Sequence, residues 1–200
     1  MDFDRLREKT FSFLENHLDE NLMYHTPEHT KEILDNTVTL ANAEKVDGKN
    51  LTILKTAALL HDIGYAKSNI EHEAVSCDIA SRWLPGFGYK AEDIQQIKEI
   101  IMSTRIPQNP KGKLSEILCD ADLYYLGGNE YESKAGLLFS EMKKLKTIKN
   151  EKQWLRLQID FLISHTFFTQ TAQKNRNSGK QNNLNKLLAK QKSIQNEQTL

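Results

Sequence analysis

The chain has 200 residues, of which 38% are hydrophobic and 27% are charged. A chain of this length and composition can bury one hydrophobic core, so we expect one domain with a terminal extension. Its 27 basic and 27 acidic residues balance, which gives no reason to expect a nucleic acid or an anionic membrane as partner.

The cysteine and hydropathy patterns indicate the cellular compartment. Cys77 and Cys119 stand alone in the sequence, which favours a reducing compartment over a disulfide framework. The N-terminus is charged and amphipathic, and no stretch approaches 18 consecutive apolar residues. We therefore expect neither a signal peptide nor a membrane span, and a cytoplasmic protein.

Helical periodicity dominates the first half of the chain. Apolar residues recur every three or four positions from Phe3 to Leu18, which predicts a first helix. Thr26 and Pro27 are a cap and a first-turn residue, so a second helix is expected over 26–43. The segment 51–61 is apolar almost all round and predicts a central, buried helix.

The second half continues in the same way. Further helices are expected at 70–84, 91–104, 114–126, 130–146 and 151–173, and the polar segment that follows is also a candidate helix. No run alternates with period two for long enough to indicate a strand. The prediction is an all-α bundle of about eight or nine helices, with one domain over 1–175 and a polar, basic extension over 176–200.

A histidine and an aspartate at the end of the apolar helix are the first sign of chemistry. His61 shares a face with Leu54 and Ala57, and Asp62 follows it directly. A buried carboxylate is costly unless it is paired or bound to a cation. A metal ion would account for both side chains. The alternative is that the pair caps a helix, or that His61 is a core histidine whose ring nitrogens are hydrogen-bonded.

Two other stretches supply similar groups. One is Tyr24–His29 (YHTPEH) and the other contains Asp120 and Asp122. Two imidazoles and two carboxylates suit a first-row divalent ion with open positions for water. On a helix, Asp122 lies with Leu118 and other apolar residues, so it is the expected ligand, and Asp120 is expected to be solvated or to support the site.

The ordered histidines and aspartates resemble the HD superfamily of metal-dependent phosphohydrolases. The stretches that match are YHTPEH at 24–29, LLHDIGY at 59–65, HEAVS at 72–76 and DADLYYLG at 120–127. The resemblance implies an HD-domain helical bundle that binds one divalent ion (Mn, Fe, Co, Ni, Zn or Mg). The four ligands that it implies are His29, His61, Asp62 and Asp122.

The same resemblance suggests roles for two other histidines. His25 matches the proton-donating histidine in the YHN…H motif of related phosphodiesterases, although Thr26 replaces the asparagine of that motif. The alternative is that His25 is a surface histidine in a loop. His72 matches a second-metal ligand of dinuclear relatives. The stretch Met102–Arg105 has no imidazole, which favours one metal and leaves His72 to contact the substrate or to be structural.

Several cationic side chains are candidates for binding substrate. Lys67 and Arg105 are expected in loops where they contact phosphate oxygens or only solvent. His165, Arg176 and Lys180 would lie along one side of a continuous helix, with about 16 Å between the first two. Only a long ligand such as a nucleotide would span that distance, and the alternative is a core His165 with an exposed basic tail.

The expected reaction is metal-dependent hydrolysis of a phosphoester. The leading substrates are small nucleotides, whether monophosphates, triphosphates or cyclic forms. His25, Asp62 and Asp122 are expected to take part in catalysis, with a carboxylate accepting the proton of a water molecule and His25 protonating the leaving oxygen. The alternatives are a non-catalytic or regulatory metal- and nucleotide-binding module, and oxygen chemistry at two irons.

Overall fold

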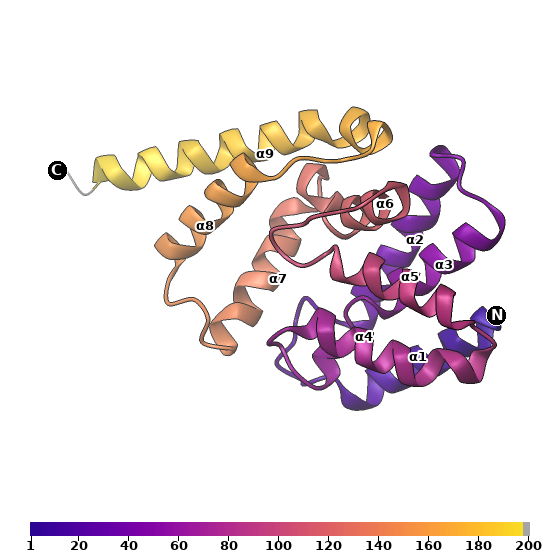
Figure 1. Ribbon diagram of the computed structural model, residues 1–200. Helices are drawn as coiled ribbons and strands as arrows, with labels where there is room; N and C mark the ends of the chain where they lie inside the picture. Colours follow the sequence, from indigo (N-terminus) through magenta and orange to yellow (C-terminus); the bar gives the residue numbers. More distant parts are fainter. Residues whose placement is uncertain (198–200) are drawn as a thin grey trace. The chain divides into compact units, whose positions relative to one another are not determined.

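A computed structural model describes residues 1–197 of the protein, and over that range it contains helices and no strand (Figure 1). The all-α prediction is confirmed. Three short 3₁₀ helices, η1 to η3, lie among the nine α-helices. In chain order the elements are α1 (Phe3–His17), α2 (Pro27–Ala43), α3 (Gly48–Leu60), η1 (Ile63–Ala66), α4 (His72–Trp83), η2 (Leu84–Phe87), α5 (Ala91–Met102), α6 (Lys113–Asp122), η3 (Tyr124–Gly127), α7 (Tyr131–Lys144), α8 (Glu151–Ser164) and α9 (Gln170–Glu197).

The chain divides into two compact units, Met1–Asp122 and Leu123–Leu200. In the first unit, α3 is the central helix, and it contacts α1, α2, α5 and α6. Its side chains explain this position, because Leu54, Ala57, Ala58 and Leu60 have no exposed surface. A helix that is apolar on every side is stable only when other elements cover all of it.

The second helix begins where the sequence predicts. The Thr26 side chain accepts a hydrogen bond from the backbone N–H of His29 at 3.3 Å, and Pro27 occupies the first turn. The backbone N–H of Thr26 also donates to the carbonyl of Tyr24 at 3.0 Å. These contacts fix His25 just before the helix and His29 in its first turn.

A close approach of two backbones joins η1 to the start of α4. The backbone N–H of Gly64 donates to the Ser76 hydroxyl at 2.9 Å. A Cβ atom at position 64 would collide with the carbonyl oxygen of His72. Only glycine allows the two segments to pack this closely, so Gly64 sets the distance between η1 and the first turn of α4.

The second unit contains η3 and the helices α7, α8 and α9, and in it one expected helix is broken. The helix predicted over 151–173 ends at Ser164, and α9 begins at Gln170. Thr169 explains the new start, because its hydroxyl accepts the backbone N–H of Ala172 at 3.1 Å. The predicted extension at 176–200 lies in α9 as far as Glu197, and residues 198–200 fall outside the described part.

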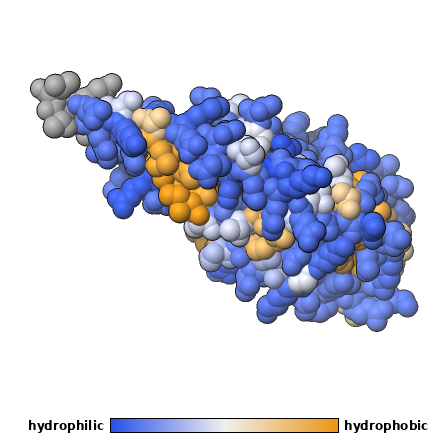
Figure 2. All heavy atoms as spheres, turned by 90° about the horizontal axis from the view of Figure 1, so that it is seen from above, coloured by the Kyte–Doolittle hydropathy of each residue, from blue (hydrophilic) through white to orange (hydrophobic). Residues whose placement is uncertain are grey.

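The surface is mostly polar. The face in Figure 2 is largely hydrophilic, with separate hydrophobic areas, whereas most large apolar side chains are buried. Within residues 1–197, no helix combines the length and apolar character that crossing a membrane requires.

The packing at Gly64 leads to a stability prediction. We expect Gly64→Ala to lower the free energy of unfolding by about 1–3 kcal/mol, because the added methyl group must push η1 away from α4. Urea denaturation followed by circular dichroism would measure the change. Gly86→Ala is the matched control, since a Cβ atom there has no neighbour within 4 Å. Equal stability of the two variants would contradict the proposed role of Gly64.

Candidate metal centre

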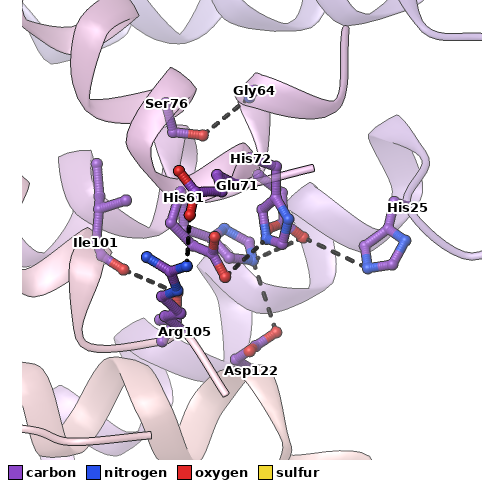
Figure 3. Close-up of polar contacts among 12 residues, drawn as sticks. His25, His61, Gly64, Glu71, His72, Ser76, Ile101, Arg105 and Asp122 are labelled. Carbon is purple, nitrogen blue, oxygen red and sulfur yellow. Dashed lines mark hydrogen bonds and ion pairs between the residues drawn. The ribbon is translucent and has the colours of Figure 1, made fainter. Parts of the chain in front are cut away.

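Three helix ends in the first unit carry the expected metal-binding side chains. His29 lies in the first turn of α2, His61 and Asp62 directly follow α3, and Asp122 is the last residue of α6. The helices α2, α3 and α6 all contact one another. Three stretches that are far apart in the sequence therefore meet at one place, as Figure 3 shows for His61 and Asp122.

The ligand atoms lie at separations that suit one cation. Asp62 Oδ2 is 3.3 Å from His29 Nε2 and 3.2 Å from His61 Nε2. Asp122 Oδ1 is 3.7 Å from the first of these nitrogens and 3.6 Å from the second. For tetrahedral ligands about 2.1 Å from a metal, the expected separation is about 3.4 Å. His29, His61 and Asp122 alone already meet the distance requirement for a metal site.

The two imidazoles present nitrogen atoms that no hydrogen bond satisfies. Nε2 of His29 and Nε2 of His61 are buried and, among the described residues, have no hydrogen-bond partner. His61 Nδ1 donates to the carbonyl oxygen of Ala58 at 2.8 Å, so its Nε2 points toward the carboxylates. A backbone contact of this kind orients a metal-binding histidine. Buried polar atoms without partners are rare in proteins, and a divalent ion would satisfy both.

The electrostatics of the site also call for a cation. Burial lowers the pKa of His29, although Asp62 acts in the opposite direction. Burial disfavours charge on His61 as well, but Asp62 and Asp122 raise its pKa well above the ordinary value. The pKa of Asp62 lies well below its usual range despite burial, because three histidines surround the carboxylate. The two carboxylates therefore favour positive charge at this place, and a divalent ion would compete with a proton for the His61 imidazole.

Two further histidines approach the same aspartate. His25 Nε2 is 4.0 Å from Asp62 Oδ2, and its side chain is 15% exposed. His72 Nε2 lies 3.3 Å from Asp62 Oδ1 and 3.3 Å from Glu73 Oε1. Both imidazoles therefore border the group of ligand atoms (Figure 3), and the side chain of His72, like that of His25, is partly exposed, at 19%.

The comparisons with known proteins support this interpretation. The family model of the HD domain matches residues 26–126, a range that contains all four expected ligands. This chain belongs to the HD-domain family. Members of this family of metal-dependent phosphohydrolases bind divalent metals. No curated protein matches the chain.

A solved structure shares the fold. It is the crystal structure of a predicted HD superfamily hydrolase from an uncultured Thermotogales bacterium, with a TM-score of 0.60 and 21% sequence identity. The match covers 95% of this chain and 91% of the other. At this identity the similarity shows that the two proteins have the same fold, and the reaction must be argued from the site of this HD-domain protein.

The two predicted phosphate-binding cations in the loops of the first unit differ in their partners. The Arg105 guanidinium donates to Glu71 Oε1 at 2.7 Å, and both side chains are about half exposed. Glu71 has a left-handed backbone, with φ of 51°, immediately before His72. Lys67 is exposed just after η1, and within the described residues it makes no ion pair.

The expectation for the second unit needs a correction. His165 follows α8 in an extended conformation, whereas Arg176 and Lys180 belong to α9, so the three do not share one continuous helix. Lys180 Nζ instead donates to the backbone carbonyl of His165 and lies 3.5 Å from its Nδ1. The Arg176 guanidinium lies 3.9 Å from the centre of the Tyr124 ring. The cap at Thr169, which breaks the helix, makes this arrangement possible.

Other residues differ from the sequence-based expectation or were missed by it. Asp120 has no exposed surface, so it is not solvated, although a supporting role stays open. Glu73 is buried beside His72, and Tyr65 stacks on His25. Both belong to stretches that resemble the HD family, but nothing in their spacing signals these contacts.

The geometry leads to a prediction about metal binding. We expect His61→Ala and Asp62→Ala to lose the divalent ion, because each removes a ligand atom and leaves unbalanced polar groups in the buried site. Elemental analysis of the purified variants would measure the loss. His17→Ala is the control, since this exposed histidine on α1 contacts the carbonyl and the ring of Phe13, which lie on the same helix. Full metal content in either site variant would refute the site.

Proposed function

We propose that the protein hydrolyses a phosphoester of a small nucleotide with the help of one divalent metal ion. The observation that supports the proposal most strongly is a pair of buried Nε2 atoms, on His29 and His61. Within residues 1–197 they lack hydrogen-bond partners, and they face two carboxylates. The family membership supports the class of reaction. The choice of a nucleotide as the substrate rests on the resemblance to the HD superfamily alone.

In the proposed mechanism, His29, His61, Asp62 and Asp122 would hold the ion. When bound, it would lower the pKa of a water molecule and offset charge on the phosphoryl oxygens. Asp122 is the more exposed of the two carboxylates, at 18% against 10% for Asp62. We therefore assign to Asp122 the acceptance of the proton that the attacking water releases.

His25 would supply the proton to the leaving oxygen. Its ring lies at the partly open edge of the site, 4.0 Å from Asp62 and 5.7 Å, between ring centres, from His29. A group in this place can reach a substrate that is bound at the metal ligands without being a ligand itself. Proton transfer by a well-placed side chain contributes about 10²- to 10⁴-fold to a rate.

Binding of the phosphate is assigned to cationic side chains. In the first unit these are Arg105, His72 and Lys67; Arg105 would exchange its Glu71 partner for a phosphate oxygen. In the second unit, we propose that an anionic ligand binds to His165, Arg176 and Lys180. Since Lys180 and His165 contact each other, one anionic group of such a ligand could contact both side chains.

A substrate panel tests the proposed reaction. The purified protein would be assayed with nucleoside monophosphates, triphosphates and cyclic nucleotides, each with Mn²⁺, Co²⁺, Ni²⁺ and Mg²⁺. We expect at least one combination of nucleotide and metal ion to release phosphate or pyrophosphate, or to open a cyclic nucleotide. Nucleotide binding without turnover under every condition would contradict hydrolysis and favour the non-catalytic module.

A substitution of His25 tests the proton donor. We expect His25→Gln to keep the metal but to lower kcat by about 10²-fold or more on an ester with a poor leaving group. The defect should shrink on a p-nitrophenyl ester, whose leaving group needs no proton. An unchanged kcat on the poor leaving group would remove the assigned role.

A substitution of Arg105 tests phosphate binding. We expect Arg105→Ala to raise KM by roughly 10- to 100-fold, because a hydrogen bond between charged groups stabilises a complex by about 1.5–3 kcal/mol. Steady-state kinetics would separate this effect from a change in kcat. Lys31→Ala on α2 replaces an exposed cation and serves as the control. An Arg105→Ala enzyme with the KM of the parent protein would exclude the contact.

A further inference from the structure

Tyr65 contacts both histidines that border the proposed metal site. Its ring centre lies 3.9 Å from that of His25, with 17° between the planes, and 4.2 Å from that of His72, with 26° between the planes. The three rings come from three separate segments, namely the loop before α2, the turn η1 and the first residue of α4. A single aromatic side chain thus links two histidines from separate segments, both of which also approach Asp62.

The backbone around Tyr65 is fixed on both sides. The preceding residue, Gly64, is bonded to Ser76 and passes against the carbonyl of His72. The backbone N–H of Tyr65 donates to the carbonyl of Asp62 at 3.0 Å. Because η1 is held to α4 and to the end of α3, the tyrosine ring has a defined position from which it can orient its neighbours.

The two histidines in turn face different oxygens of one carboxylate. His25 approaches Asp62 Oδ2 at 4.0 Å, and His72 approaches Asp62 Oδ1 at 3.3 Å. His72 also lies 3.3 Å from Glu73 Oε1, and the His25 ring also meets the ring of Tyr24 edge to face, with 4.9 Å between the ring centres. Tyr65 adds to these a face-to-face stacking contact with each imidazole, which is attractive and limits rotation of both rings.

We propose that Tyr65 is a positioning residue that holds His25 and His72 in place on the two sides of Asp62. The proposal rests on the proposed function, in which His25 protonates the leaving oxygen. Tyr65 itself does not transfer a proton in this scheme. Its ring keeps the His25 imidazole in the orientation that proton transfer requires, so the aromatic ring is needed and the hydroxyl is not.

Two substitutions separate the ring from the hydroxyl. Tyr65→Phe keeps the ring and is expected to retain kcat within about threefold. Tyr65→Leu removes the stacking and should lower kcat by about 10- to 100-fold on a substrate with a poor leaving group, since misplaced catalytic groups commonly cost this much. Metal content, measured by elemental analysis, should change little, whereas KM should rise in Tyr65→Leu, because the ring also holds His72, which is assigned to the phosphate. A Phe variant as slow as the Leu variant would overturn the proposal.

A double-mutant cycle shows whether Tyr65 acts through His25. If it does, adding Tyr65→Leu to His25→Gln should slow the enzyme no further, because the group that the ring positions is already gone. The Tyr65→Leu defect should also shrink on a p-nitrophenyl ester. Multiplicative effects of the two substitutions, or an equal defect on both esters, would indicate general damage to the structure and overturn the proposal.

A spectroscopic measurement keeps this inference separate from the proposed reaction. Protein labelled with ¹³C-histidine would be examined by NMR, with signals assigned through His25→Gln and His72→Gln. Stacked rings shift each other's ring protons, so Tyr65→Leu should move the signals of both histidines and leave that of His17 in place. Unmoved signals would overturn the positioning role. Moved signals in a protein that hydrolyses no phosphoester would uphold the positioning and refute the proposed function.

Discussion

The site depends on the meeting of two buried imidazole nitrogens with two carboxylates at the ends of three packed helices. His29 and His61 supply the nitrogens, and Asp62 and Asp122 supply the oxygens. Such a group is costly to bury unless the charges are balanced. The surrounding helices enforce the burial, because His61 and Asp62 directly follow the buried second half of α3.

In the proposed function, the remaining features of the site serve to bind and protonate the substrate. Around the ligand atoms, the structure places groups that are partly exposed and that can gain or lose partners, such as His25, His72 and the Arg105–Glu71 pair. The buried ligands and the partly open rim have different roles. The first would fix a cation, whereas the second would recognise and protonate whatever binds to it.

The sequence predicts well those features that depend on local patterns. The Thr26–Pro27 start of α2, the buried central helix and the choice of Asp122 as a residue facing the site all follow from capping rules and helical periodicity. Their agreement with the structure is understandable, because each of them is determined by residues within one or two turns.

Features that depend on contacts between distant segments were not predicted. The break before α9 depends on Thr169, whose cap competes with an apparently continuous helical pattern. Burial of Asp120 depends on how α6 packs, and the Tyr65 stack depends on the passage of η1 across the first turn of α4. The left-handed backbone of Glu71 has no signal in the sequence, since glycine or asparagine would be the usual residue there.

The direction in which α3 and α6 run affects how strongly the site attracts a positive ion. Both α3 and α6 reach the site with their C-terminal ends, at Leu60 and Asp122. The carbonyl groups at the end of a helix carry a partial negative charge of about half an electron. The main chain at these two ends therefore attracts positive ions, whereas the positive N-terminal ends of α2 and α4, where His29 and His72 lie, act in the opposite direction. The carboxylates of Asp62 and Asp122 are thus what makes the site attract a cation.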